Sequence, residues 1–119
     1  MTPGSRLLAS QELLDEIENV TVPPDVVIDI YFRRRRYAGS GDRRAIKDRV
    51  YNILRRREKL DWWIKRTDIG LPPSTRTRLI ADLAMSDRSA ADQIAGWFSG
   101  AKYSLQALDC VERELADAL

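Results

Sequence analysis

The sequence predicts an all-α protein, a single domain built as a bundle of six to seven short helices. The chain has 119 residues, of which 44% are apolar and 32% charged, a balance typical of a folded globular domain. Stretches of apolar residues at helical spacing are separated by short breaks that contain Gly or Pro. Neither an internal repeat nor a linker divides the chain, which favours one bundle.

The first two predicted helices lie on either side of a break at Pro23. The first runs from about Ser5 to Val20 and the second from about Pro24 to Arg36. The β-branched residues of the second stretch also fit a strand, but its apolar positions do not alternate, so we expect a helix. The expected core residues of the two helices are Leu7, Leu13, Leu14, Ile17 and Val20, then Val26, Val27, Ile30 and Tyr31.

The stretch Asp42–Arg66 is the longest one that lacks Gly and Pro and keeps a helical period. We expect Asp42 to cap the helix, because its carboxylate can accept from first-turn amides. The period holds to Leu54 with Ile46, Val50 and Ile53 on the same face. Because Arg57 would fall on that apolar face, we expect a bend or break near Arg55–Glu58. A shorter helix follows whose inward residues are Leu60, Trp63 and Ile64.

Three further helices are predicted after the break at Gly70–Pro73. Ser74 can cap a helix over about 75–86 with Leu79, Ile80 and Leu83 in the core. Ser89 with Asp92 resembles a capping box, and the short helix it opens passes through Ile94, Trp97 and Phe98 to Gly100. Asp109 with Glu112 fits the same pattern and opens a last helix that passes through Leu115.

The chain has no histidine and one cysteine, which excludes most catalytic and metal-binding arrangements. Cys110 stands beside Asp109 and Glu112 rather than beside cations, which disfavours a nucleophilic role. Gly39-Ser40-Gly41 precedes a helix, but no strand precedes it and Asp42 would repel an anion, so we interpret it as a turn. We expect no catalytic site, no cofactor and no metal in this chain.

No apolar run approaches the roughly 20 residues of a membrane-spanning helix. The N-terminal stretch becomes acidic too early for a secretory signal or a transit peptide. The single cysteine fits a reducing compartment. We therefore expect a cytoplasmic monomer that does not enter a membrane.

Positive charge is concentrated in residues 33–66, which hold 14 Lys and Arg against 4 Asp and Glu. One reading is a solvated face in which Arg44 pairs with Asp48 and the arginine stems cover apolar surface. We favour nucleic-acid binding, because 11 of these cations are arginines, which suit bidentate phosphate contacts. The candidate phosphate-binding residues are Arg33, Arg34, Arg35, Arg36, Arg43, Arg44, Lys47, Arg55, Arg56, Arg57 and Lys59.

Trp62 lies off the expected core face, beside Lys59, Lys65 and Arg66. Such a tryptophan can stack on an RNA base. Packing against a neighbouring helix or domain is the commoner role and remains the alternative.

Several motifs resemble the N-terminal domain of the Sun/Fmu (RsmB-type) ribosomal RNA cytosine-5 methyltransferases, in particular their alphaproteobacterial branch. The resemblance extends over nearly the whole chain. The stretches that carry it are Gly41–Ile46, Val50–Arg56, Leu60–Trp63, Arg78–Ala81, Phe98–Tyr103 and Glu112–Leu115.

The resemblance implies a NusB-like all-helical fold that binds ribosomal RNA. In that family the domain precedes a catalytic domain that binds S-adenosylmethionine and uses two cysteines. None of those catalytic motifs occurs here, so the resemblance implies an N-terminal fragment whose partners are ribosomal RNA and its own C-terminal catalytic domain. Two alternatives stay open. One is a free-standing NusB-like factor in transcription antitermination. The other is a structural module whose basic face docks on the catalytic domain.

Overall fold

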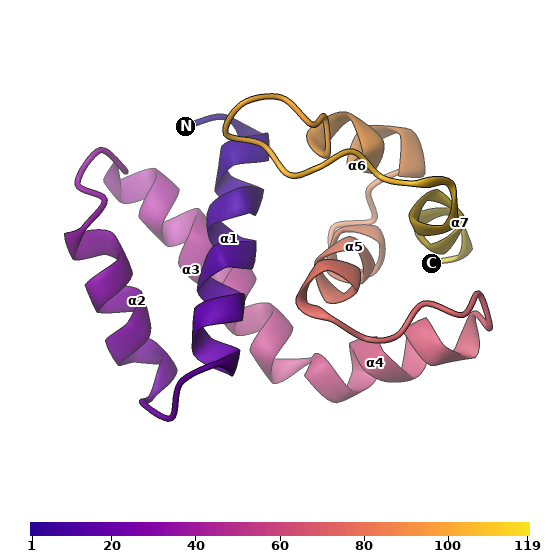
Figure 1. Cartoon of the computed structure of the whole chain (residues 1–119), viewed down its shortest axis with the longest axis horizontal. Coiled ribbons are helices and arrows are strands. Elements are labelled where there is room, and N and C mark those ends of the chain that lie inside the picture. Colours follow the sequence, from indigo (N-terminus) through magenta and orange to yellow (C-terminus); the bar gives the residue numbers. More distant parts are fainter.

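Seven α-helices and no strands make up the computed structural model, which describes residues 1–119 (Figure 1). The predicted all-α bundle is therefore confirmed. None of the helices has the length and apolarity needed to cross a membrane. The helices are α1 (Pro3–Glu18), α2 (Pro24–Arg33), α3 (Ser40–Arg55), α4 (Arg57–Arg66), α5 (Thr75–Met85), α6 (Ala91–Trp97) and α7 (Cys110–Ala118).

Helix α1 begins earlier and ends earlier than predicted. The side-chain oxygen of Thr2 accepts a hydrogen bond from the Ser5 amide at 3.1 Å and caps the helix. Leu7, Leu13 and Leu14 are buried as expected. The helix ends at Glu18, so Val20 lies outside it and is 46% exposed. The prediction that Val20 belongs to the core was wrong.

Helix α2 ends at Arg33, three residues before the predicted end, and its buried face differs from the expected one. Val27 and Tyr31 are buried as predicted, but Val26 and Ile30 are exposed. Ile28 and Phe32 take their places in the core. The reason is that α2 packs mainly against α1, at the edge of the bundle, so one narrow face of it is covered (Figure 1).

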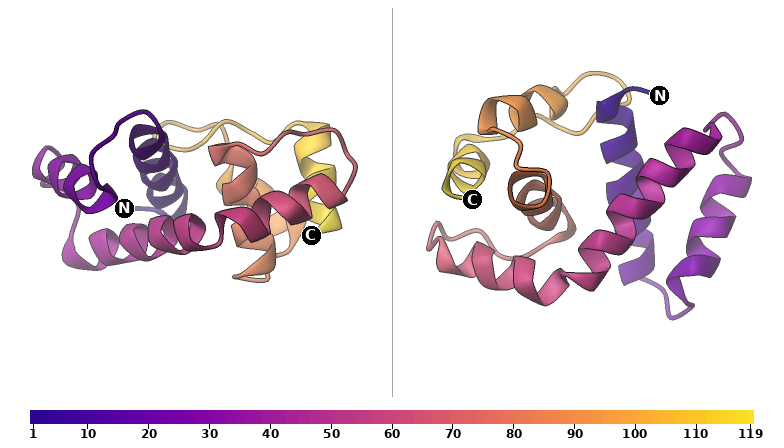
Figure 2. Two further views of the ribbon diagram at one scale, coloured as in Figure 1. Left: turned by 90° about the horizontal axis from the view of Figure 1, so that it is seen from below. Right: turned by 180° about the vertical axis from the view of Figure 1, so that it is seen from behind.

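Helices α3 and α4 meet at the predicted break. Arg56, with φ −104° and ψ 11°, separates the end of α3 from the start of α4. The two helices follow one another along one side of the molecule (Figure 2, left). In α4, Leu60 and Ile64 are buried as expected, but Trp63 is 38% exposed, so its predicted inward position was wrong.

Asp42 does not cap α3, contrary to the prediction. The helix begins at Ser40, with Gly39 at the cap position and no side-chain cap. Asp42 thus lies in the first turn and accepts a hydrogen bond from Arg6 Nε of α1 at 2.7 Å. Hydrogen bonding to Arg6 lowers the pKa of Asp42 against the opposing effect of burial. Asp42 therefore ties α3 to α1.

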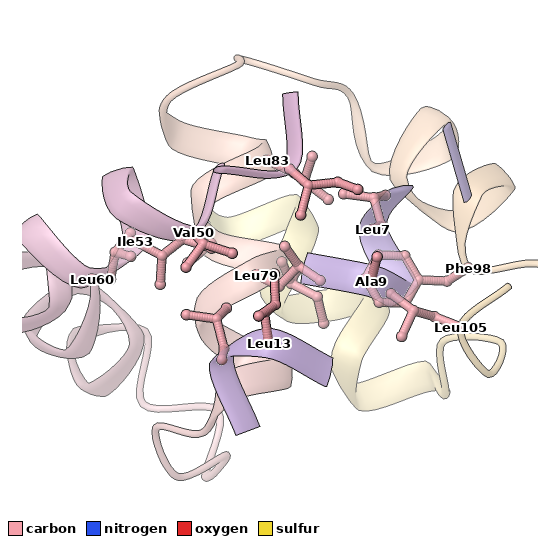
Figure 3. Packing of buried hydrophobic residues seen from close by; sticks show 14 of the residues in the cluster. Leu7, Ala9, Leu13, Val50, Ile53, Leu60, Leu79, Leu83, Phe98 and Leu105 are labelled. Carbon is pink, nitrogen blue, oxygen red and sulfur yellow. The ribbon is translucent and has the colours of Figure 1, made fainter. Parts of the chain in front are cut away.

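Helix α5 is the centre of the bundle and contacts α1, α3, α4, α6 and α7. Ser74 and Thr77 form a capping box at its start, as the position of Ser74 predicted. Leu79, Ile80 and Leu83 are fully buried as expected. Figure 3 shows Leu79 among side chains of α1 and α3, with Leu60 of α4 at the edge of the same core.

The predicted cap is confirmed for α7 but not for α6. Asp109 and Glu112 form the predicted capping box of α7, with the Glu112 amide donating to Asp109 Oδ1 at 2.8 Å. Helix α6 has Ala90 at its cap position without a side-chain cap, so the predicted capping box at Ser89 was wrong. It ends at Trp97 rather than Gly100, with Phe98 buried and Trp97 half-buried.

Candidate nucleic-acid interface

A basic hollow of about 440 Å³ lies between α2 and α3. Four of the predicted phosphate-binding cations line it, together with Phe32 and one acidic residue, Asp29. Two of these cations come from the end of α2 and the loop after it, and two from the first half of α3. The four cations are Arg33, Arg36, Arg43 and Lys47, and we call this site the basic hollow.

Phe32 lines the basic hollow and lies close to two of its cations. Its ring is buried at the end of α2, where it packs edge-on against Tyr31 at 5.4 Å between centroids. Arg43 Cζ lies 5.8 Å and Lys47 Nζ 5.9 Å from the Phe32 ring centroid. Each of these distances allows a cation–π attraction. One aromatic ring from α2 thus positions two cations from α3.

The cations of the basic hollow have no acidic partners. None of the four forms an ion pair within 4.0 Å, and Asp29 forms none either. Arg43 Nε is buried and has no hydrogen-bond partner. Four cations that converge around a single acidic side chain leave a net positive potential. The basic hollow therefore has the electrostatics of an anion-binding site.

A second hollow, of about 510 Å³, adjoins the first one at the start of α3. It shares Arg43 and Lys47 with the basic hollow and adds Arg44, also a predicted site residue, together with the acidic Asp48. Arg44 is exposed and makes no ion pair, so the Arg44–Asp48 pair that belongs to the alternative reading, the solvated face, does not form. The two hollows together form a continuous basic surface around Lys47.

Three other predicted site residues are engaged within the protein. The Arg35 guanidinium lies 3.7 Å from the Tyr31 ring centroid and 3.5 Å from Glu12. Arg57 pairs with Glu18 of α1 at 3.2 Å, and Arg56 donates to Ser86 Oγ at 3.2 Å. These contacts place Arg35, Arg56 and Arg57 in the framework of the bundle.

Arg35 contacts both the ring and the carbonyl oxygen of Tyr31. Burial, followed by the nearby Glu12 carboxylate, raises the pKa of Tyr31 to about 12, while Arg35 has the opposite effect. Arg35 also donates to the Tyr31 carbonyl oxygen at 3.3 Å. Stacking, hydrogen bonding and ion pairing all fix the same guanidinium beside α2.

The remaining predicted residues are exposed and make no ion pair. Arg34 follows α2, Arg55 ends α3, and Lys59 lies in α4. Arg55 is eight residues beyond Lys47, which is about 12 Å along the helix. The structure therefore divides the predicted basic face into the basic hollow at one end of α3, with Arg34 next to Arg33 in the sequence, and a smaller group, Arg55 and Lys59, at the other end.

Arg49 lies on α3 within the basic block, but it serves the fold. Its guanidinium binds Asp82 Oδ2 at 2.8 Å and Asp87 Oδ2 at 2.7 Å. Burial lowers the pKa of Arg49, but the hydrogen bonds and the negative charges of Asp87 and Asp82 together raise it by more. Its partners lie 33 and 38 residues away, so no local pattern could have revealed this role.

No group of three or more His, Cys, Asp or Glu side chains could hold a metal ion. Cys110 is exposed at the first turn of α7.

No protein-family model matches the chain, and no curated protein or solved structure is significantly similar to it. The resemblance to the Sun/Fmu methyltransferases and the NusB-like topology therefore stay predictions that rest on the motifs quoted above.

Proposed function

We propose that this chain binds RNA and that the basic hollow holds its backbone phosphates. The observation that carries the proposal is the convergence of four unpaired cations from α2, its following loop and α3. A folded protein gains nothing from such a concentration, because like charges repel. A polyanion removes that repulsion and releases its own counterions on binding.

The arrangement of the cations suits phosphates better than a single carboxylate. Three of the four are arginines, whose planar guanidinium groups form bidentate hydrogen bonds with phosphate oxygens. The adjoining hollow adds Arg44, so the cations extend over a surface rather than converging on one point. A chain of phosphates can contact such a surface at several positions simultaneously.

The salt dependence of RNA binding tests the proposal. The measurement is the fluorescence anisotropy of a labelled RNA oligonucleotide titrated with the chain between 50 and about 300 mM salt. If four phosphates are neutralised on a single strand, the logarithm of the affinity should fall with the logarithm of salt with a slope of about −3.

Charge-removing variants locate the site. Arg36→Gln and Lys47→Gln should each weaken binding several-fold and reduce the salt slope by about one. Arg88→Asn is the matched control, because Arg88 also carries one positive charge but lies after α5. Its φ of 53° suits Asn. Equal losses in all three variants would show that binding depends on total charge and would overturn the basic hollow as the site. No affinity at low salt would overturn RNA binding and favour docking of the basic face on a protein.

We further propose, on the resemblance alone, that the RNA is ribosomal and that a separate catalytic domain methylates it. Cross-linking of the chain to total cellular RNA, followed by sequencing, tests the first part. Ribosomal fragments should be enriched relative to the Arg36→Gln variant at the same protein concentration. Equal enrichment of all RNA classes would argue against a ribosomal target while leaving phosphate binding intact.

A further inference from the structure

We infer that the exposed face of α4 binds an unpaired nucleobase, which stacks on Trp62. The inference rests on the proposed RNA binding and adds the class of RNA, one with unpaired nucleotides at this position. It depends on a different set of residues from the basic hollow, so the two can be tested apart.

Trp62 occupies the side of α4 that faces away from the core. Leu60 and Ile64 of the same helix are buried, whereas Trp62 is 53% exposed. Trp63 lies against it edge-on, with 4.9 Å between ring centroids, and also lines a groove toward Met85 and Leu119. Trp62 is thus the more exposed of two adjacent indoles, and its neighbour braces it.

Unpaired cations surround this indole. Arg66, one turn later, holds its guanidinium 5.0 Å from the Trp62 ring centroid. Lys59, one turn earlier, and Lys65 are exposed, and none of these three cations forms an ion pair. The acids nearest in sequence are Glu58, also exposed, and Asp61, which is engaged with Arg78 at 2.7 Å. The surface around Trp62 is therefore aromatic at its centre and mainly positive at its rim.

A nucleotide matches both parts of this surface. Its base offers a flat face for the indole, and its phosphate offers a negative charge for Lys59 or Arg66. Arg66 can also stack on a base through its guanidinium plane. An apolar protein partner would leave Lys59, Lys65 and Arg66 without counter-charges. In a duplex the base faces are covered by their neighbours, so Trp62 selects for unpaired nucleotides.

The position of α4 makes this contact compatible with the basic hollow. Helices α3 and α4 follow one another along one side of the molecule (Figure 2). Arg55, which ends α3 and is exposed, falls between Lys47 and Trp62 in the sequence. Fifteen residues separate Lys47 from Trp62, which corresponds to at most about 22 Å along the helices. One strand of several nucleotides can span that distance.

The test compares single-stranded and duplex RNA on three variants of the full chain. The probes are a labelled 12-nucleotide oligouridylate and a labelled RNA duplex of the same length. Trp62→Ala should weaken binding of the single strand about tenfold and leave duplex binding unchanged. The salt slope should not change, because no charge is removed. Trp62→Phe should keep most of the affinity, and Trp63→Phe is the matched control.

Tryptophan fluorescence gives a second readout at the residue itself. Stacking on a base should quench Trp62, so oligouridylate should quench the Trp63→Phe chain and have little effect on the Trp62→Phe chain. The third tryptophan, Trp97, is half-buried in α6 and supplies the constant background in both variants.

The outcomes separate the two proposals. Unchanged single-strand affinity of Trp62→Ala, or equal losses for the single strand and the duplex, would overturn the stacking inference while Arg36→Gln still tests the basic hollow. If Trp62→Ala weakens binding but Arg36→Gln and Lys47→Gln do not, stacking stands and the basic hollow is wrong. If no RNA binds at low salt, both fail.

Discussion

Arg49 of α3 binds the fully buried carboxylate of Asp82 in α5, with 2.8 Å between Arg49 Nη1 and Asp82 Oδ2. Asn52 Nδ2 donates to the other carboxylate oxygen at 2.6 Å, and Ser86 Oγ donates to it at 2.9 Å. A buried carboxylate is tolerated when its oxygens are paired in this way. The contact joins the helix that carries the basic hollow to the central helix of the bundle.

Removal of Arg49 should destabilise the fold strongly. In Arg49→Leu the Asp82 carboxylate stays buried without a counter-charge, so the free energy of unfolding should fall by about 3 kcal/mol. Arg44→Leu is the control, since Arg44 is exposed and unpaired, and it should change stability by less than about 0.5 kcal/mol. Urea denaturation followed by circular dichroism measures both. A loss of unfolding free energy in Arg49→Leu as small as that in Arg44→Leu would show that the Arg49–Asp82 pair contributes little to stability.

Helix α7 should depend on its cap. Asp109→Ala removes the carboxylate that accepts from the Glu112 amide at 2.8 Å, and it should lower the free energy of unfolding by about 1 kcal/mol. Asp117→Ala lies in the last turn of the same helix and should be neutral or slightly stabilising, because an acid is unfavourable there. Thermal unfolding of the two variants makes the comparison, and an equal effect would contradict the capping role.

Stability should fall at acidic pH, partly through Glu112. The hydrogen bond from Arg76 Nε, at 2.5 Å, lowers the pKa of Glu112 more than its burial raises it. A lowered pKa in the folded state adds stability above the pKa of the unfolded chain. That stability is lost as the pH falls through the folded value, below the ordinary value of about 4.3. Asp42, whose pKa is lowered by Arg6, should act in the same direction.

The Glu112→Gln variant isolates this contribution. It should be less stable than the parent chain at pH 7, and the difference should shrink as the pH is lowered toward 2. Glu114→Gln, on the exposed side of the same helix, serves as the control and should follow the parent chain at every pH. A difference that stays constant with pH would mean that Glu112 acts through packing rather than charge.

Inorganic phosphate should stabilise the chain through the basic hollow. A ligand that binds only the folded state raises the unfolding temperature. Phosphate should therefore raise it above the value in sodium chloride of equal ionic strength. Arg43→Gln should reduce the increase, because Arg43 lies in both hollows, whereas Arg88→Asn should retain it. Differential scanning fluorimetry with all three chains is sufficient, and identical increases would exclude a specific phosphate site.

The features that the sequence by itself determined are those set by residues a few positions apart. Helical spacing predicted the all-α bundle. The position of Arg57 on the apolar face predicted a break near Arg55–Glu58, which the structure has at Arg56. Ser74 and Asp109 were predicted correctly as caps, because a capping residue acts on amides two or three positions later. The same rule failed at Asp42 and Ser89, whose side chains cap no helix. Helix propensity, capping and periodicity are all encoded within one or two turns.

The tertiary structure alone decided which charged side chains are unpaired and which aromatic side chains are exposed. Arg57 and Glu18 are 39 residues apart, and Arg49 and Asp87 are 38 apart, so each pairing depends on how α1, α3, α4 and α5 pack. The same packing leaves Val26 and Trp63 exposed, although their spacing fits a core position. It also gathers Arg33, Arg36, Arg43 and Lys47 around Phe32. These pairings join residues of distant segments that the packing brings together, and the spacing of residues within one helix does not predict them.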